Sequence, residues 1–546
     1  MMQKTVIILM SLCFTLYSCK EQTSTTLDNV EASIDMMLEQ LDMQVMAGIE
    51  AGTEAGTEAG TEAGTEAGTE AGTEAGIEAG TEAGTEADPW LAEQAQLSQD
   101  GQLALVPKEQ RVGDAEAGWE YLRYGNFIGT GIPAEVLTIL NLDFSDGNKL
   151  MREGDNANLG RSFNAFDAPN GVRVIGGITC IGCHSSYLEG ELIIGLGNTF
   201  SNYTQDRNSA LIPVIDNIIN TQFGVDSPEA EAYLEFRRGS ARVAPFVVAP
   251  FRGLNPAFRI EDAAASMRDP NTFAWQDEPL FDLPAVGYAS DVPPWWNVKK
   301  KAALYYNGMG RGDFAKMIMQ TSVVAIANVE QAKDIHSRFD DLLAWMYELE
   351  PPVFPRDIDQ EAQARGQQIF ETNCTRCHGT YHEDPSQETY PNLLVSLDTV
   401  GTDPFYASYA NQNPDLSRWL NRSWYAQTDA EGEDRLQAFP LPGYVAPPLD
   451  GIWASAPYLH NGSVPNLKTL LNSTLRPVRW QRNFDSTAYD FDNMGWPYTV
   501  PNDDELLNDP NVYDTQVEGY SSQGHIFADH LSDEERSDLL EYLKSL

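Results

Sequence analysis

Two copies of the motif Cys-x-x-Cys-His constrain this chain more than any other feature of its sequence. They are Cys180-Ile-Gly-Cys183-His184 and Cys374-Thr-Arg-Cys377-His378. With this spacing, two thiols can add across the two vinyl groups of one haem, and the histidine that follows can turn beneath the porphyrin and bind its iron. The motifs therefore predict two covalently bound haem c groups, held by the four cysteines, with the two histidines as proximal iron ligands.

Three other functions of paired cysteines would also explain part of this pattern. These are a pair of local disulfides, two Cys-x-x-Cys redox sites, and a four-cysteine zinc site. A zinc site needs no histidine after the second cysteine, and a thioredoxin-like redox site needs a βαβ context. Because a histidine follows directly in both motifs, the pattern favours haem.

The N-terminus indicates export. Residues 1–18 hold one early lysine, an apolar stretch over 6–16 and small residues before Cys19, which is typical of a signal peptide. Residues 16–19 resemble a lipobox, so Cys19 is the expected lipid site, and Lys20 favours an outer-membrane anchor. The alternative is an ordinary cleaved signal, which would leave a periplasmic protein.

A repeat and a strong negative charge follow. The tetrapeptide Ala-Gly-Thr/Ile-Glu runs ten times over residues 47–86, and such a segment has too little apolar mass to bury a core. We expect residues 19–90 to be a lipidated, disordered tether. The whole chain has 81 acidic and 35 basic side chains, a net charge of −46. This charge excludes a nucleic-acid binder, which needs clustered Lys and Arg.

The rest of the chain divides into two predicted haem domains. The N-terminal one spans residues 91–350, a linker covers 351–357, and the C-terminal one spans 358–546. Patterns of apolar residues predict single helices over 329–349 and 358–370, the second with Gly366 placed to meet another helix. The residues before Cys180, 171–179, are glycine-rich and predict an extended segment.

The C-terminal domain is predicted to close on itself. Ser532-Asp-Glu-Glu535 is a capping box that opens a final helix with an apolar stripe of leucines. This helix, together with the helix before Cys374, resembles the helix pair of a class I cytochrome c. Residues 380–440 are expected to be a long polar insert between them.

Four further segments carry a resemblance to a known family. They are Arg123–Pro133, Pro293–Lys301, Asp450–Pro465, and Gly524-His525. With the two motifs, they make most of residues 110–546 resemble the dihaem c-type cytochromes of the bacterial dihaem cytochrome c peroxidase superfamily, most like the rubber oxygenase branch. The resemblance implies a mainly α fold with much loop and two cytochrome c-type haem domains, the C-terminal one class I-like. It also implies that the N-terminal haem binds O₂ or peroxide, and that the C-terminal haem is bis-ligated and handles electrons.

The remaining histidines are candidates for the second ligand of the C-terminal haem. The resemblance points to His525, with His530 as the alternate. His460 matches a superfamily run, where a hydrogen bond near the haem is expected rather than ligation. His382 follows His378 too closely to cross the haem, and His336 is expected to pack on its helix.

The first haem is expected to keep an open iron position. No histidine other than His184 lies in the first domain before His336. Its methionines are expected in the core. Apolar and aromatic side chains are available as a wall for the pocket: Val243–Phe251, Trp295, Trp296, Tyr305 and Tyr306. We expect Trp295 and Trp296 to be functional, since the family places aromatic residues beside the first haem and toward the second.

Three functions remain open at this stage. The first is an oxidoreductase that activates O₂ at the N-terminal haem and cleaves an apolar unsaturated substrate, either polyisoprene-like or a fatty acid. The second is a peroxidase that reduces H₂O₂ with electrons from a small redox cytochrome, and it requires a Glu or Gln over the first haem. The third is a dihaem electron carrier without a substrate. In each case the only expected membrane contact is the N-terminal lipid.

Overall fold

The computed structural model describes residues 89–546, except 141–144, 178, 207, 428–434 and 502–508. The predicted signal peptide, the lipid site at Cys19 and the repeat over 47–86 lie outside the described residues and stay predictions. In the part of the chain that is described, no helix has both the length and the apolar character needed to cross a bilayer.

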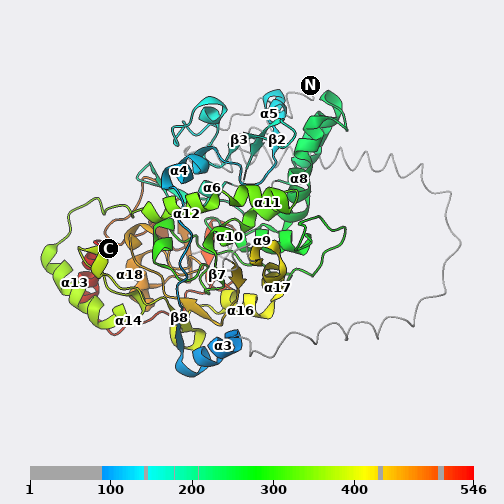
Figure 1. Ribbon diagram of the computed structural model, residues 1–546. Coiled ribbons are helices and arrows are strands. Elements are labelled where there is room, and N and C mark those ends of the chain that lie inside the picture. Colours follow the sequence, from blue (N-terminus) through cyan, green and yellow to red (C-terminus); the bar gives the residue numbers. More distant parts are fainter. Residues whose placement is uncertain (1–88, 141–144, 178, 207, 428–434, 502–508) are drawn as a thin grey trace, which may run out of the picture. The chain divides into compact units, whose positions relative to one another are not determined.

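Helices are the main regular elements of the described residues (Figure 1). The α-helices are α3 (Pro89–Asp100), α4 (Ala115–Tyr124), α5 (Ala134–Leu140), α6 (Cys180–Cys183), α7 (Ile212–Gln222), α8 (Pro228–Val243), α9 (Ala257–Ser266), α10 (Phe314–Ile318), α11 (Val329–His336), α12 (Phe339–Glu348), α13 (Gln360–Asn373), α14 (Thr375–His378), α15 (Leu397–Val400), α16 (Phe405–Gln412), α17 (Asp415–Arg422), α18 (Leu467–Leu470) and α19 (Asp533–Leu543). Short 3₁₀ turns are η1 (Gly154–Asn158), η2 (Ala244–Phe246), η3 (Trp295–Lys300), η4 (Gln320–Val324), η5 (Pro385–Gln387), η6 (Trp424–Ala426), η7 (Ile452–Ala454) and η8 (Ser473–Leu475).

Short strands form small antiparallel sheets between the helices. The strands are β1 (Gln102–Ala104), β2 (Ile132–Pro133), β3 (Asn164–Asp167), β4 (Arg173–Gly176), β5 (Ser185–Leu188), β6 (Glu191–Ile194), β7 (Gly310–Gly312), β8 (Leu393–Ser396), β9 (Leu436–Ala438), β10 (Gly443–Val445), β11 (Arg479–Arg482), β12 (Tyr498–Thr499) and β13 (Val512–Asp514). Their orders are β1-β8-β10, β12-β11-β13, β2-β4-β3, β5-β6 and β7-β9. The expectation of a mainly helical protein is therefore confirmed in part: helices predominate among the described residues, and small antiparallel sheets, which were not expected, lie between them.

The sheets bring distant parts of the chain together. Strand β8 pairs with β1 on one side and with β10 on the other, opposing Val395 to Gln102 and to Tyr444. Strand β7 pairs with β9, more than a hundred residues later. Each pairing fixes a segment that precedes residue 350 against one that follows it, or closes the C-terminal segment on itself.

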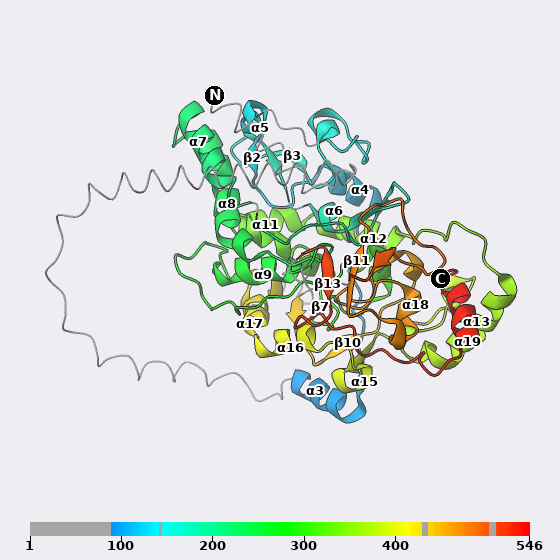
Figure 2. The ribbon, with the colours of Figure 1, turned by 180° about the vertical axis from the view of Figure 1, so that it is seen from behind.

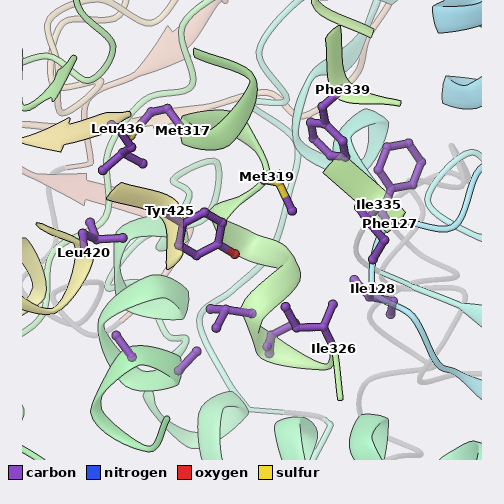
Figure 3. Packing of buried hydrophobic residues seen from close by; sticks show 14 of the residues in the cluster. Phe127, Ile128, Met317, Met319, Ile326, Ile335, Phe339, Leu420, Tyr425 and Leu436 are labelled. Carbon is purple, nitrogen blue, oxygen red and sulfur yellow. The ribbon is translucent and has the colours of Figure 1, made fainter. Parts of the chain in front are cut away.

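The largest apolar cluster, named here the first core cluster, combines buried residues from 122–346 with buried residues from 406–444. In Figure 3, Met319 lies among side chains from both parts, including Phe127 and Tyr425. The polar insert expected over 380–440 is therefore largely folded, and its helices α16 and α17 contribute Tyr406 and Trp419 to this cluster.

A second core cluster lies mainly in the C-terminal part of the chain, from Phe354 to Leu543, with a few earlier residues such as Leu188 and Trp296. Residues 96–546 group into one unit. The predicted domain boundary over 351–357 stays a prediction. Here the chain has neither helix nor strand, between the end of α12 and the start of α13.

Of the predictions for short segments, two are confirmed and one is wrong. The capping box is confirmed, since Ser532 accepts from the Glu535 amide and the Glu535 carboxylate accepts from the Ser532 amide. The extended segment before Cys180 is confirmed in β4. The single helix over 329–349 is wrong, because α11 ends at His336 and α12 begins at Phe339. At the break the Ser337 hydroxyl donates to the Asp334 carbonyl at 2.6 Å, a local bond that competes with continued helix.

Helices α13 and α19 cross closely near the C-terminus (Figure 2). Gly366 makes this crossing possible, because a Cβ atom there would lie 2.0 Å from the Asp538 carbonyl oxygen. The predicted contact of Gly366 with another helix is therefore confirmed. An ion pair beside it joins Arg365 to Asp538 at 2.7 Å.

Replacing Gly366 with Ala should force the two helices apart. We expect a loss of roughly 1–3 kcal/mol in the free energy of unfolding, as for other overpacked sites, measured by urea denaturation. Gln368→Ala on the exposed side of α13 is the matched control and should leave stability nearly unchanged. Equal stability of Gly366→Ala and the wild type would contradict the close crossing.

Candidate functional site

The first motif forms a single helical turn, α6, followed by His184. The amide of His184 donates to the Cys180 carbonyl at 3.0 Å and so extends the turn of α6 to the histidine. The ring stacks on Trp295, with centroids 4.7 Å apart and planes at 20°. Burial lowers the pKa of His184 to about 4, opposed by the backbone of Pro293. The imidazole is therefore neutral at physiological pH, which is the form that binds a metal.

The second motif ends in the same way. Helix α14 carries Cys377 and His378, and the His378 amide donates to the Cys374 carbonyl at 3.0 Å. His378 Nδ1 lies 2.8 Å from the Pro447 carbonyl oxygen. When Nδ1–H donates to that carbonyl, the tautomer is fixed and Nε2 is left free for a metal.

A second imidazole faces His378. The ring centroids of His378 and His525 are 6.2 Å apart. Two imidazoles bound to opposite sides of one metal, with bonds of about 2 Å, would place their ring centres about 6 Å apart. Burial, together with the positive potential of His378 and Arg476, lowers the pKa of His525 to about 4. The geometry therefore fits an iron between two neutral histidines.

The backbone around His525 is held tightly. Gly524 has φ +74°, and a Cβ atom there would lie 2.1 Å from the backbone carbon of Gly401. The His525 amide donates to the Val400 carbonyl at 2.8 Å. His530, the alternate ligand, is exposed, so the structure brings His525 and not His530 to His378.

The cysteines fit thioether attachment. All four are free, and burial raises the pKa of Cys180 to about 12 and that of Cys374 to about 11. Among the described residues, no three His, Cys, Asp or Glu side chains gather as a metal-ion site, so the cysteines do not form the four-ligand zinc site considered above. Lys301 is a further point of fit. Burial lowers its pKa to about 8, and a haem propionate would supply a counter-charge.

The two motifs differ in what faces the histidine. In the described part of the chain, no second imidazole stacks near His184, where the ring neighbour is Trp295. Ile181 is fully buried, and Cys180 packs against the first core cluster. The first motif therefore has one histidine in apolar surroundings, whereas the second has two.

Trp295 and Trp296 connect the motifs. Trp295 belongs to the first core cluster and Trp296 to the second. The Trp296 indole N–H donates to the Asp450 carbonyl at 2.8 Å. A Cβ atom on Gly451 would lie 3.2 Å from the Trp296 ring, so this ring packs directly on the chain that follows Pro447.

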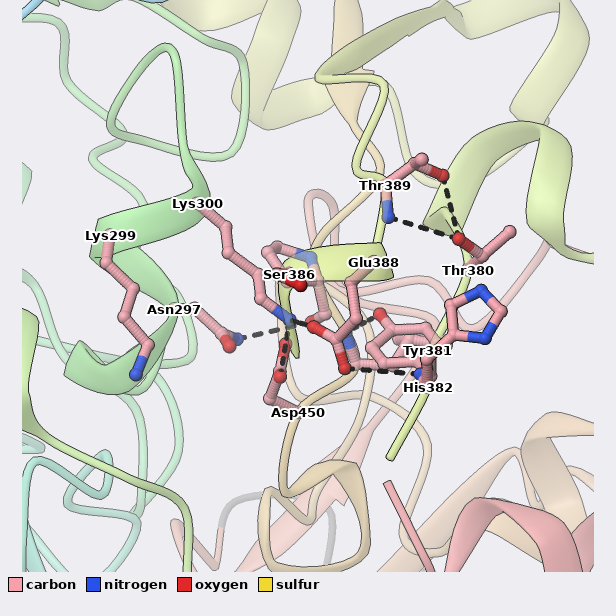
Figure 4. Close-up of polar contacts among 12 residues, drawn as sticks. Asn297, Lys299, Lys300, Thr380, Tyr381, His382, Ser386, Glu388, Thr389 and Asp450 are labelled. Carbon is pink, nitrogen blue, oxygen red and sulfur yellow. Dashed lines mark hydrogen bonds and ion pairs between the residues drawn. The ribbon is translucent and has the colours of Figure 1, made fainter. Parts of the chain in front are cut away.

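Lys300 strengthens the same connection (Figure 4). Its ammonium lies 2.6 Å from Asp450 Oδ1 and 2.7 Å from Glu388 Oε2. Glu388 follows the second motif, and its other oxygen accepts from the His382 amide at 3.4 Å. The His382 side chain is exposed. Burial is the largest single effect and lowers the pKa of Lys300. The contributions of the two carboxylates together outweigh it and hold this pKa above its usual value.

His460 lies in a buried group of aromatic side chains. Its ring stacks on Tyr444 at 4.2 Å, and the Tyr444 hydroxyl lies 3.2 Å from its Nε2. Burial lowers the pKa of His460 to about 3. Tyr306 and Tyr406 border the ring at 6.2 and 5.9 Å. A hydrogen-bonding role therefore fits this histidine better than ligation. His336, the last residue of α11, is partly buried beside Arg111, as expected for a packed residue.

Buried carboxylates in this region escaped the sequence analysis. Both oxygens of Glu261 accept from the Tyr305 hydroxyl, at 2.8 and 2.7 Å, and burial raises the pKa of Glu261 to about 8. Burial also raises the pKa of Asp291 well above its usual value. Their placement depends on contacts between distant segments, so single carboxylates in an acidic chain gave no signal. Pro293 and Pro447, in contrast, are marked in the sequence, because each begins a Pro-Pro pair.

Glu261 should make stability depend on pH. Its folded pKa, about 8, lies above the unfolded value of 4.5. The unfolded chain therefore loses this proton first, and the stabilisation present below pH 4.5 is lost as the pH rises toward 8. Glu261→Gln should reduce that loss by a few kcal/mol, at about 1.4 kcal/mol per pKa unit, measured by denaturation between pH 4.5 and 8. The exposed Glu361→Gln is the control, and identical profiles for Glu261→Gln and wild type would contradict the assignment.

Comparison with known proteins finds similarity over parts of the chain. Residues 443–481 match the family described as RoxA-like, cytochrome c-like. Two curated relatives come from Sinorhizobium fredii (strain NBRC 101917 / NGR234). The uncharacterized protein y4iM is 28% identical over 261 residues, which are 45% of this chain and 58% of the relative. The uncharacterized protein y4iJ is 28% identical over 256 residues, which are 36% of this chain and 41% of the relative. The matches thus span about half the length of these relatives.

One solved structure is also similar in part. It is a chain of Kuenenia stuttgartiensis hydrazine synthase pressurized with xenon, at 16% identity, covering 55% of this chain and 90% of that chain. Its TM-score of 0.20 is too low to establish a shared fold. The RoxA-like match covers the segment that holds Pro447, Asp450 and His460. The C-terminal part of the chain is therefore cytochrome c-like, and the match supports haem c and a haem-containing oxidoreductase.

Proposed function

We propose that this chain is an exported dihaem c-type oxidoreductase. In this proposal the haem at the first motif activates O₂ to cleave an apolar unsaturated substrate, either polyisoprene-like or a fatty acid. The haem at the second motif passes electrons. A lipid on Cys19 anchors the protein to the outer membrane, or it is periplasmic if this cysteine is not modified.

The observation that carries the proposal is the difference between the two histidine environments. His378 faces His525 at a spacing that suits a six-coordinate iron, while His184 has an indole beside it and no facing imidazole in the described residues. A haem iron with one open coordination position can bind O₂ or peroxide and change its redox state. A filled position cannot, so the division of labour follows from the ligands.

The surroundings of the first motif support an apolar substrate. Ile181, Trp295 and Val298 are buried members of the largest apolar cluster. Such side chains exclude water, which protects reactive states and favours a hydrocarbon over a charged ligand. The neutral His184 would hold the iron from one side, and Trp295 would keep its ring in place by stacking.

Trp296 and Lys300 would act between the two groups. Trp296 joins the segment after Trp295 to the segment after Pro447, whose carbonyl lies beside His378. An indole in this position suits electron transfer between the two sites. Lys300 would keep the two segments at a fixed spacing through Asp450 and Glu388.

Reduction of H₂O₂ is the second candidate function, and Glu261 favours it. A carboxyl group with a pKa of about 8 is protonated at neutral pH and can give a proton. Tyr305 holds it in place. In that case a small redox cytochrome would supply the electrons.

The proposal is tested by optical and EPR spectra of the purified holoprotein, in air and after addition of H₂O₂, combined with product analysis. We expect one high-spin or O₂-bound haem beside one low-spin haem, and carbonyl products from a polyisoprene oligomer or oleate in air. Turnover with H₂O₂ and a reduced cytochrome, without cleavage products, would instead establish the peroxidase. Two low-spin haems that respond to neither oxidant would mean an electron carrier.

The ligand assignment has its own test. His525→Ala should convert the low-spin second haem to high spin while both haems stay attached, because only the imidazole facing His378 is removed. His530→Ala, five residues away and exposed, is the matched control and should keep the wild-type spectrum. The reverse result would assign the ligand to His530.

A further inference from the structure

A pocket opens on the surface at helices α4 and α12. Its volume is about 480 Å³, and it is lined by Asp114, Ala115, Glu116, Trp119, Trp345 and Glu348. These residues come from α4 and α12, which lie side by side (Figure 1), and from the residue before α4. The pocket therefore combines acidic side chains with two indoles.

The two indoles are stacked. The ring centroids of Trp119 and Trp345 are 5.2 Å apart, with planes at 20°. Gly118 allows this approach, because a Cβ atom there would lie 2.0 Å from the Asp341 carbonyl oxygen of α12. The Arg123 guanidinium lies 5.1 Å from the Trp119 ring centroid and pairs with Glu120. Both indoles are partly exposed.

From this stack, aromatic contacts continue to the first motif. Trp345 meets Trp295 edge to face at 6.1 Å, and Trp295 stacks on His184 at 4.7 Å. Three consecutive ring contacts thus join a surface pocket to the histidine expected to hold the first iron. The chain of rings uses Trp295 and leaves Trp296, which lies toward the second motif, outside it.

We propose that Trp119, Trp345 and Trp295 form an electron path from a donor bound at this pocket to the group held by His184. This inference rests on the proposed function, since it needs a haem at the first motif. One electron leaves the donor, which is oxidised by one electron, and the ferric iron accepts it and becomes ferrous. No bond is made or broken, and the three indoles end as they began. The site at His184 would thereby receive electrons without help from the second motif.

The pocket selects a donor with a positively charged contact surface. Asp114, Glu116 and Glu348 line it, and no basic side chain does. The Asp114 carboxylate caps α4 by accepting from the Glu116 and Ala117 amides. Glu116 and Glu348 are exposed and have no ion pair among the described residues, so their charges are available to an occupant. Opposite charge speeds association and makes it sensitive to salt. The occupant is therefore a cationic one-electron donor, and in the cell this donor would be a small basic redox protein.

The test measures reduction of the first haem of the holoprotein by stopped-flow absorbance, with hexaammineruthenium(II) as the cationic probe. Trp345→Leu should slow this reduction about tenfold or more, which corresponds to ~1.4 kcal/mol of activation free energy per factor of ten. Tyr347→Leu, on the same helix but outside the ring chain, is the control and should react like the wild type. Equal rates for Trp345→Leu and Tyr347→Leu would overturn the path.

The docking part is tested separately. The double variant Glu116→Gln/Glu348→Gln should lower the second-order rate with the ruthenium probe at low salt and leave the rate with ferrocyanide unchanged or higher. The double variant Glu361→Gln/Glu534→Gln, exposed on α13 and α19, removes the same two charges elsewhere and controls for overall charge. A salt dependence equal to that of the control would overturn the pocket as the docking site.

A third readout does not depend on electron delivery. When the holoprotein is treated with H₂O₂ and no donor, oxidation should accumulate on Trp119, detected by peptide mass spectrometry, and should disappear in Trp345→Leu. Trp119 oxidation that persists in Trp345→Leu would contradict the path. Failure of the proposed function is distinguishable, because it would appear in the wild type as a first haem that is low-spin and inert to oxidants.

Discussion

The burial of Trp295 and Trp296 in two different core clusters holds the two motifs in one arrangement. Consecutive side chains cannot move apart, so the ring beside His184 and the ring bonded to the Asp450 carbonyl share one short backbone segment. Asp450 in turn follows Pro447, whose carbonyl lies 2.8 Å from His378. A displacement of either histidine would therefore disturb an indole that is almost fully buried, and close packing resists such disturbance.

Acidic side chains have different roles in the interior of the protein and at its surface. The interior accepts a carboxylate only when it is paired or protonated, since an isolated buried charge is costly. Asp450 and Glu388 share the ammonium of Lys300, and Glu261 keeps its proton up to a pH of about 8. By contrast, Glu116 and Glu348 are exposed, at the pocket over Trp119 and Trp345. The same residue type thus serves packing in one place and recognition in another.

The sequence predicted the features that depend on neighbours in the chain. The extended segment before Cys180, the capping box at Ser532 and the role of Gly366 follow from short patterns. The approach of His525 to His378 was expected only through a family resemblance, because some 150 residues separate them. The break after His336 and the hydrogen bond between Tyr305 and Glu261 could not be predicted. The first depends on one local serine bond and the second on segments that meet only in the folded chain.

The helices α16 and α17 fill the first core cluster although they follow the second motif in sequence. A gene divided at residues 351–357 would therefore yield two products with large complementary aromatic surfaces open to water. Neither product would hold its own motif in the environment described above, and each would be prone to associate. The two halves of this chain therefore depend on each other for folding, since a cut at residues 351–357 would remove α16 and α17 from the core that surrounds the first motif.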